Sequence, residues 1–428
     1  MTSICAQGIS ITNIRCSGGA AALTAQLRAI YGTDLIGLWI GEDIVVDGSN
    51  NVTSWPGRVG GALAPTSATL YTKATVSGRT AIANTVSAGV VGYTATLSVL
   101  PKALFTVAAP TTLPFGNYNT AIWRGDNGLY LFGNSSTSEW YTVGAIYRNG
   151  ATGISVGSGS NIYEADLASG SNNAIYVGTQ TQVVGRSWLG TISFAMAIAA
   201  VPTALQRLQT QLALDIYYRP AVAPAAQLAL DLYNILGADI TGLWIGEDIV
   251  ASGSNISYWP GRLGPVLMNS GVDPLLKSTL GSRVSTYNDT GIEVGIWATL
   301  SAAPQSVFAV IDLTSLPFVD THVVVGSLAG PENTIVGEYT STPNWMTDTG
   351  YAHYYNGASS ELAHTGPGVY EGVKAGVTAT DIRVGGFGGD YGGYEFKGKI
   401  ACVMSLSAIP SAGNRAAVVA LLRAYYGF

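Results

Sequence analysis

The sequence predicts an all-β protein with two β-sandwich domains in tandem and short α-helices beside each domain. Three observations lead to this prediction: a duplicated segment, many short strand-like stretches separated by turn signals, and helical patterns confined to the ends of the two copies. The 428 residues allow two to three domains, and 47% hydrophobic residues are ample for packed cores, which excludes a disordered chain.

The duplication is visible in the sequence itself. The string GLWIGEDIV stands at 37–45 and again at 242–250, and each copy continues into a Trp-Pro-Gly-Arg turn, at 55–58 and 259–262. The middles of the copies have diverged almost completely, whereas their ends correspond again. We predict four segments: an N-terminal arm with a short helix (1–32), a first sandwich domain (33–219), a Pro-containing linker with a helix (220–237) and a second sandwich domain (238–428).

Apolar residues at three- and four-residue spacing predict four helices. Two of them precede the copies and end at Gly32 and Gly237, because glycine readily adopts the conformation that terminates a helix. The other two close the copies and begin after Thr203 and Ser411, whose hydroxyl groups can cap the first turn. Between the copies, the Arg-Pro-Ala-Val-Ala-Pro stretch at 219–224 interrupts the helical pattern and marks the linker.

Between the helices, short stretches rich in Val, Ile, Phe and Tyr predict strands. Asn-Gly pairs at 149–150 and 356–357 are typical of the turns that join neighbouring strands. Many short strands with helices only at the margins favour a sandwich. The clearest strand candidates are 103–108, 128–132, 191–197, 306–312, 322–326 and 399–406.

Charged residues make up only 11% of the chain, where an ordinary soluble domain carries about 25%. A polar but nearly uncharged surface is typical of particle-bound or extracellular β-proteins that contact other proteins. The net charge of −6 argues against a nucleic-acid partner, because phosphate recognition needs clustered Lys and Arg. The longest apolar run, 192–202, is far shorter than the roughly 20 residues of a spanning helix, and no signal peptide is legible, so we expect no membrane contact.

Three cysteines cannot form a disulfide framework, and only three histidines argue against a transition-metal centre. We expect Cys5, Cys16 and Cys402 to be reduced and buried, while a bond between Cys5 and Cys16 stays open. No cofactor is expected. Calcium is left open, because the acidic residues of the second half are scattered, whereas a calcium loop gathers several oxygens within about a dozen residues.

The order of motifs is the same in both copies. A Gly-Leu-Trp strand leads to the Trp-Pro-Gly-Arg turn, a variable β region, a Val-Gly strand, a Phe/Trp-x-Gly-x-Ile segment and a helix after a proline. This order resembles the concanavalin A-like, or laminin G-like, jelly-roll sandwich family over residues 34–218 and 239–428, which implies that each last strand returns beside the first. Pro-Gly-Arg replaces the family's Asp-x-Ser-Gly at 56–58 and 260–262, which leaves a family calcium site open.

Tandem domains of this kind, with few charges and Gly-, Ser- and Thr-rich surfaces, resemble bacteriophage virion proteins such as head decoration, collar, tail and fibre subunits. The resemblance implies a non-enzymatic structural protein of the virion, assembled in the host cytoplasm, whose partners are other virion proteins and copies of itself. Residues 1–22 are predicted to form an arm that orders only against a neighbouring subunit. The alternative is a carbohydrate-binding adhesin, or a receptor-binding, lectin-like protein with glycan partners.

A retaining glucanase on this fold needs a Glu-x-Asp-x-x-Glu pattern, which places two carboxylates about 5 Å apart in one cleft. The nearest string begins at Glu164 and Asp166 but has Ser169 in place of the last acid, and the second copy shows no equivalent. The sequence also lacks a Gly-x-Ser-x-Gly nucleophile motif and a phosphate-binding loop. It therefore predicts no enzyme and no catalytic residue.

Both copies carry a Glu-Asp pair that is followed by the arginine of the Trp-Pro-Gly-Arg turn. The carboxylates could form a calcium or sugar site, or the arginine could bridge them as a structural ion pair. We favour the ion pair, because the flanking tryptophans are expected in the core. The candidate ion-pair residues are Glu42, Asp43, Arg58, Glu247, Asp248 and Arg262.

Aromatic residues beside Gly-rich loops allow three interpretations: packing at the sandwich edges, contact with other proteins, or stacking on sugar rings. The loops of the two copies differ in sequence, which favours two different protein neighbours over two identical sugar sites. The candidate contact aromatics are Trp123, Trp140, Tyr141, Trp345, Tyr354, Tyr355, Tyr391 and Tyr394.

Overall fold

The computed structural model describes residues 19–428 with internal gaps. Residues 1–18 of the predicted arm, with Cys5 and Cys16, lie outside the described residues, as do Tyr391 and Tyr394. The gaps are 69, 86–90, 116–118, 126–129, 134–135, 142–144, 150, 153–155, 158, 167–168, 181–185, 270–273, 289–294, 315, 317–321, 328–329, 338–342, 346–351 and 387–395.

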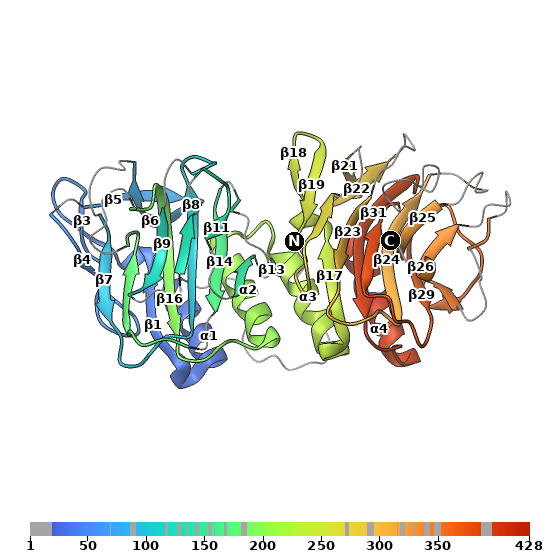
Figure 1. Cartoon of the computed structure of the whole chain (residues 1–428), viewed down its shortest axis with the longest axis horizontal. Helices are drawn as coiled ribbons and strands as arrows, with labels where there is room; N and C mark the ends of the chain where they lie inside the picture. Colours follow the sequence, from blue (N-terminus) through green and yellow to red (C-terminus); the bar gives the residue numbers. More distant parts are fainter. Residues whose placement is uncertain are drawn as a thin grey trace.

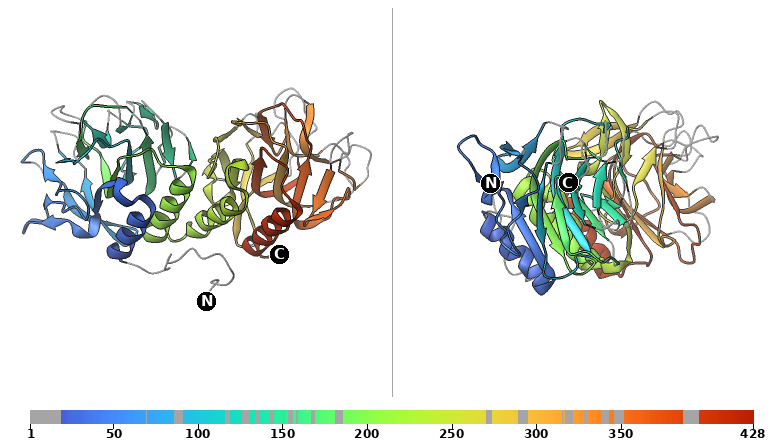
Figure 2. Two further views of the ribbon diagram at one scale, coloured as in Figure 1. Left: turned by 90° about the horizontal axis from the view of Figure 1, so that it is seen from below. Right: turned by 60° about the vertical axis from the view of Figure 1, so that its left-hand side comes forward.

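The four predicted helices are present as α1 (Ala20–Tyr31), α2 (Ala204–Tyr218), α3 (Ala223–Leu236) and α4 (Ala412–Tyr426). They lie in a row on one side of the sheets, and contacts join α1 to α2, α2 to α3 and α3 to α4 (Figures 1 and 2). Helix α1 begins inside the segment that we predicted to be an arm. Pro224 stands in the first turn of α3, where its missing N–H costs nothing.

The first copy contains sixteen described strands, which form two sheets and a hairpin. One sheet has the order β13-β12-β14-β8-β16-β6-β5, with β1 also paired to β16; the other has the order β11-β10-β9-β15-β7-β4. The strands are β1 (Leu35–Ile40), β2 (Val45–Val46), β3 (Val52–Ser54), β4 (Ala64–Pro65), β5 (Thr72–Val76), β6 (Arg79–Asn84), β7 (Tyr93–Thr96), β8 (Ala103–Pro110), β9 (Thr120–Arg124), β10 (Tyr130–Gly133), β11 (Trp140–Tyr141), β12 (Ala145–Arg148), β13 (Ala151–Thr152), β14 (Asn161–Asp166), β15 (Ala174–Val177) and β16 (Gly190–Ile198).

The described strands of the second copy follow one continuous path, β26-β25-β30-β23-β20-β19-β21-β22-β31-β24-β29-β27-β28, with β17 also paired to β31 and β18 to β19. They are β17 (Ile240–Ile245), β18 (Val250–Ser252), β19 (Asn255–Trp259), β20 (Leu267–Asn269), β21 (Leu276–Leu280), β22 (Arg283–Asn288), β23 (Ile296–Thr299), β24 (Ser306–Leu313), β25 (His322–Ser327), β26 (Gly330–Gly337), β27 (Ala352–Tyr355), β28 (Ala358–Ser359), β29 (Gly366–Val373), β30 (Asp381–Val384) and β31 (Gly398–Leu406).

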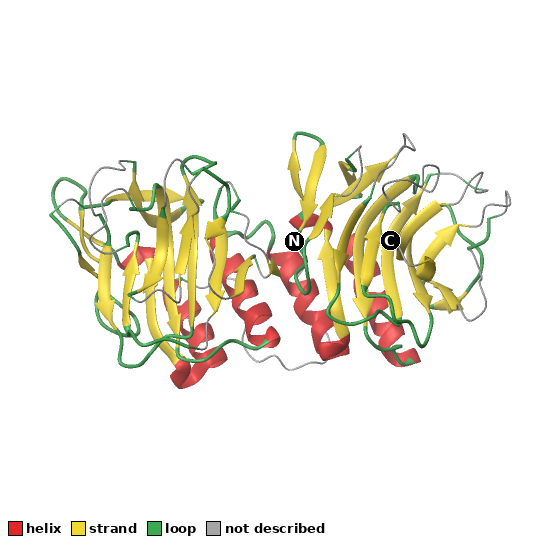
Figure 3. Cartoon of the chain, viewed as in Figure 1, coloured by secondary structure: helices red, strands yellow, loops and turns green. Residues whose placement is uncertain are grey.

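The predicted fold class is confirmed: the chain is all-β with short flanking helices, and its antiparallel sheets are compatible with jelly-roll sandwiches (Figure 3). The last strand of each copy pairs antiparallel with the first, so that Leu38 lies opposite Met196 and Leu243 opposite Met404. No helix in the described part of the chain is long and apolar enough to cross a membrane.

Each copy packs its inner sheet on both faces. In β16, Ile192 and Ala195 point into the core between the sheets, whereas Phe194 and Met196 point into the core beneath α1 and α2. Burial on both faces explains why this strand reads as a continuous apolar run and does not alternate with polar residues. The inter-sheet core holds the duplicated tryptophans, and the Trp55 Nε1 donates to the Ile40 carbonyl at 2.8 Å.

Candidate functional site

The duplicated Gly-Glu-Asp segments form the short 3-10 turns η2 (Gly41–Asp43) and η4 (Gly246–Asp248) after the first strand of each copy. In the first copy, the Arg58 guanidinium donates to both carboxylate oxygens of Asp43, at 2.6 and 2.7 Å. Glu42 lies 3.7 Å from Arg79 of β6. This arrangement ties the turn to two neighbouring segments of the same copy.

The second copy repeats the two-point pair between Arg262 and Asp248, again at 2.6 and 2.7 Å. Here the arginine also donates to Asp215 of α2 at 3.1 Å, and Asp215 accepts a further bond from Arg219. The Arg262 and Asp215 side chains are completely buried. The ion pair of the second copy is therefore part of a buried network that attaches it to the last helix of the first copy.

Glu247 lies 3.6 Å from Arg283, so each of the four predicted carboxylates forms an ion pair with an arginine. Burial raises the pKa of Glu247 and of Asp248, and the neighbouring Arg262 opposes the shift of Asp248. Among the described residues, no three His, Cys, Asp or Glu side chains are grouped to hold a metal ion. Within this part of the chain, the arrangement is that of structural ion pairs.

A second pair of ionic contacts, which we did not predict from the sequence, joins each closing helix to its sheet. Arg207 of α2 donates to Glu164 of β14 at 2.8 Å and also contacts Asp166. Arg415 of α4 contacts Glu371 of β29. Glu371 occupies the place of Glu164, opposite a phenylalanine of the neighbouring strand, but Val373 stands where the first copy has Asp166, so the second copy lacks the two-acid string, as we stated.

The two arginines occupy the same position in their helices, four residues after the N-caps Thr203 and Ser411. This position does not indicate which strand each side chain meets, so no pattern in the sequence predicts the carboxylate partners. Each arginine also lies over a tyrosine of the next strand, Tyr147 at 4.1 Å and Tyr354 at 3.8 Å.

Two adjacent carboxylates in one place raise the question of acid–base catalysis. Burial raises the pKa of Glu164 well above its ordinary value, and the neighbouring Asp166 raises it further. Burial also raises the pKa of Asp166. However, the side chains of Glu164 and Asp166 are only 4% and 5% exposed beneath α2, which leaves no access for a sugar chain. The cluster fastens a helix to a sheet.

Three of the predicted contact aromatics are buried. Trp123 is 7% exposed, and Trp140 and Trp345 are each 1% exposed. Trp140 stacks on Trp188 with 5.8 Å between ring centroids, and Trp345 packs edge-on against Tyr370. Trp140 and Trp345 belong to the cores between the sheets. Trp123 lies on the opposite face of β9 from the core residue Ile122 and packs against Tyr176, with 5.1 Å between ring centroids. Because all three are covered by other parts of the chain, we no longer count these tryptophans as contact residues.

The remaining candidates are partly buried or outside the described part. Tyr354 and Tyr355 are half-buried, and Tyr355 stacks on His364 with 4.0 Å between ring centroids. The Tyr141 side chain is not among those described. Sequence reasoning overlooked Trp297 of β23, which is 38% exposed and lies directly across from Met268. Exposed and buried side chains alternate along β23 in the structure, but Ile, Trp and Ala are all apolar, so the sequence pattern does not show that Trp297 faces outward.

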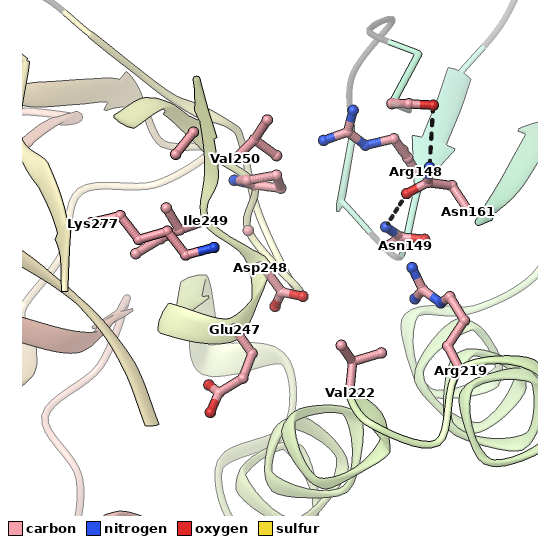
Figure 4. A pocket seen from close by; sticks show the side chains of 14 residues that line it. Arg148, Asn149, Asn161, Arg219, Val222, Glu247, Asp248, Ile249, Val250 and Lys277 are labelled. Carbon is pink, nitrogen blue, oxygen red and sulfur yellow. Dashed lines mark hydrogen bonds between the residues drawn. The ribbon is translucent and has the colours of Figure 1, made fainter. Parts of the chain in front are cut away.

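A cavity of about 310 Å³ lies at the junction of the two copies (Figure 4). Strand β12 contributes Arg148, and Arg219 lies between α2 and α3. The second copy contributes Asp248, Val250 and Lys277. Basic side chains therefore reach the cavity from both copies and from the segment between them.

Comparison with known proteins yields no matching family model and no match among curated proteins. Among solved structures, the chain is similar to a mutant Trypanosoma rangeli sialidase displaying trans-sialidase activity, with 12% identity, a TM-score of 0.31, and coverage of 55% of this chain and 41% of that chain. It is also similar to Trypanosoma rangeli sialidase, with 10% identity, a TM-score of 0.26, and coverage of 88% and 61%. The chain thus spans less than two thirds of either structure.

This comparison contradicts our prediction that the chain is not an enzyme, because the matched structures are sialidases. We withdraw that prediction. A TM-score of 0.31 or less at 10–12% identity carries no argument about the activity or substrate of this chain.

Proposed function

We propose that the chain is a structural subunit of a bacteriophage particle that acts through contacts with other virion proteins and with copies of itself. The observation that carries the proposal is the fixed junction of the two copies. Asp215 of α2 and Arg262 of the second copy are paired at 3.1 Å with both side chains fully buried, in a helix layer that continues across the junction. Because the junction is fixed, the molecule presents the similar surfaces of its two copies at a constant separation.

The surface composition agrees with this role. With 11% charged residues, wide areas can be covered by a neighbour at a low desolvation cost, which suits repeated contacts in an assembly. The concanavalin A-like assignment of each copy belongs to the same proposal. It rests on the motif order of the sequence and on the pairing of first and last strands in each copy.

Quantitative mass spectrometry of particles purified from the source tests the proposal. We expect this chain at a fixed copy number relative to the major capsid protein, with hundreds of copies for a decoration or tail role and about three to twelve for a collar, baseplate or fibre. A chain that is absent from purified particles, or present at a ratio that varies between preparations, contradicts the proposal.

The second candidate function is carbohydrate binding, and Trp297 is the observation in its favour. The exposed indole of Trp297 lies beside Met268 on the neighbouring strand and offers a flat apolar surface of the kind that stacks on sugar rings. A glycan array with wild type and Trp297→Ala tests this function, and Trp345→Phe, a change within the core, serves as the control. Binding that persists in Trp297→Ala, or an array with no bound glycan, argues against it.

A further inference from the structure

The cavity at the junction contains a buried cation without a complete set of partners. Arg148 is only 4% exposed, and within the described structure its Nη1 has no hydrogen-bond partner. Its guanidinium lies over the ring of Tyr258, a residue of the second copy, at 5.1 Å. A buried N–H group without a partner is costly, and such groups commonly receive a ligand or water.

The Arg148 guanidinium points into the cavity. Figure 4 shows the Arg148 guanidinium pointing across the open space toward the segment of Val250. Gly157 lines the same wall, and a Cβ at this glycine would lie 3.0 Å from the Arg148 Nη1. The space beside the guanidinium therefore depends on the absence of a side chain at residue 157.

Two further basic groups reach the cavity. Arg219 extends from the turn after α2, and Lys277 comes from β21 of the second copy. Asn149 adds a side-chain amide whose nitrogen donates to Asn161 at 2.9 Å. Cationic groups thus approach the same space from three different parts of the chain.

The two acidic residues of the lining are each paired with an arginine behind them, and within the described structure the buried Glu247 Oε2 has no hydrogen-bond partner. Both oxygens of Asp248 accept bonds from Arg262, and Glu247 lies 3.6 Å from Arg283. In Figure 4 the Glu247 carboxylate lies on the far side of Asp248 from Arg148. The pairs with Arg262 and Arg283 leave the positive charge of Arg148 and Lys277 uncompensated.

We propose that this cavity is a binding site for a small ligand bearing a phosphate or carboxylate group, with Arg148 and Lys277 as its anion-binding residues. Arginine offers two parallel N–H donors that match the oxygens of such a group, and lysine adds a point charge. The volume of about 310 Å³ is at the lower end of the range of ligand pockets, roughly 300–1,000 Å³, so the ligand is small. Because the walls come from both copies, the bound ligand holds them together.

Calorimetric titration and thermal unfolding of the full chain, with inorganic phosphate and citrate as probes, test the proposal. We expect saturable binding of at least one probe and a rise in the unfolding temperature that saturates with it, since a ligand that binds only the folded state stabilises it. The two probes separate a phosphate ligand from a carboxylate ligand. Glucose, which carries no charge, is expected to give neither signal.

The decisive variant is Lys277→Glu, because Lys277 is exposed on β21 and its replacement leaves the core intact. We expect a loss of affinity of at least about tenfold, because one charge-assisted hydrogen bond is lost and the new carboxylate repels an anion. The matched control is Lys73→Glu. Lys73 occupies the same place on β5 of the first copy, and its N–H bonds to the Asn50 carbonyl as that of Lys277 bonds to the Ser254 carbonyl, but it lines no part of the cavity.

Arg148→Lys provides a second variant, which keeps the positive charge and removes the forked donor. Its affinity is also expected to fall, because lysine keeps the charge but cannot offer two parallel N–H donors, and its unfolding transition shows whether the fold is intact. Wild type that binds neither phosphate nor citrate overturns the proposal. Equal losses in Lys73→Glu and Lys277→Glu also overturn it, because they indicate a diffuse surface charge effect.

Discussion

Arg58 and Arg262 occupy the same position in the two copies but lie in different surroundings. The Arg58 side chain is 27% exposed and bonds one carboxylate, whereas that of Arg262 is completely buried between Asp248 and Asp215. A partly exposed ion pair contributes little because water screens it, whereas removing one member of a buried network leaves an uncompensated charge. The duplicated residue therefore stabilises the two copies to different extents.

We predict that Arg262→Met lowers the free energy of unfolding by about 3–5 kcal/mol, because Asp248 and Asp215 remain buried without their partner. The matched variant Arg58→Met is expected to cost about 1 kcal/mol or less. Urea unfolding followed by circular dichroism measures both. Equal losses in the two variants would contradict the difference in burial.

The carboxylates beneath α2 predict a dependence of stability on pH. Burial raises the pKa of Glu164 and of Asp166 above the unfolded values of about 4. A raised pKa means that the folded state binds the proton more tightly than the unfolded state does. The two carboxyl groups therefore make their full contribution to the free energy of unfolding below about pH 4, and this contribution is lost as the pH rises through the folded pKa. We expect Glu164→Gln to unfold with a weaker pH dependence than wild type between pH 4 and 8. Melting temperatures of wild type and variant across this pH range test the prediction. The same slope of melting temperature against pH in both proteins would contradict a raised pKa of Glu164.

At the scale of elements, the helix ends are fixed by local side-chain bonds. The Thr203 hydroxyl accepts from the Gln206 N–H at 3.2 Å, and the Gln206 side chain accepts from the Thr203 N–H at 2.9 Å. This reciprocal pair is a capping box. At α4, Ser411 accepts from the Asn414 N–H at 3.1 Å, and no reciprocal bond from Asn414 is among those described.

We predict that the double variant Thr203→Ala, Gln206→Ala destabilises the chain by about 1–2 kcal/mol, because both bonds of the capping box are lost together with the bond from Gln206 to the Ile30 carbonyl. Ser411→Ala is expected to cost about 1 kcal/mol or less, since one bond is lost. Thermal unfolding of the two variants provides the comparison. A larger loss in Ser411→Ala would show that the reciprocal bond of Gln206 contributes nothing.

The turn between the first strand and its ion pair depends on a glycine. A Cβ at Gly41 would lie 1.8 Å from the Thr80 carbonyl oxygen, a backbone atom that cannot move aside cheaply. We predict that Gly41→Ala costs more than about 3 kcal/mol, above the usual cost of overpacking. Gly48→Ala is the control, because no atom lies within 4 Å of its Cβ position. Urea unfolding of both variants measures the two losses, and equal unfolding midpoints would contradict the prediction.

At the scale of the whole molecule, the row of four helices joins the copies. Leu208 and Leu212 of α2 share a core with α3 and with the second copy. Aligning the tyrosine pairs that end α2 and α4 places the exposed residues Ala416 and Ala420 at the positions of these two leucines. The same alignment places Arg423 where α2 has Asp215. The contact that joins the copies is therefore not repeated at α4, as at the capping end of a repeat array.

We predict a single cooperative unfolding transition for the two copies, because the junction carries both an apolar core and the buried pair of Asp215 with Arg262. Asp215→Ala is expected to separate the transition into two in scanning calorimetry. Arg423→Ala at the exposed equivalent position serves as the control and is expected to leave one transition. Two transitions in wild type would contradict the coupling of the copies.

The sequence by itself determined the duplication, the four helices with their caps, the strand class and the burial of the duplicated tryptophans. These features follow from local periodicity and from identical strings. Only the tertiary structure decided which polar and aromatic residues face inward. Arg207 and Glu164 are 43 residues apart, and Trp140 becomes a core residue through the pairing of β11 with β10. Such proximity depends on strand register and helix placement, which no local pattern encodes, and the cavity at Arg148 exists only because two copies meet there.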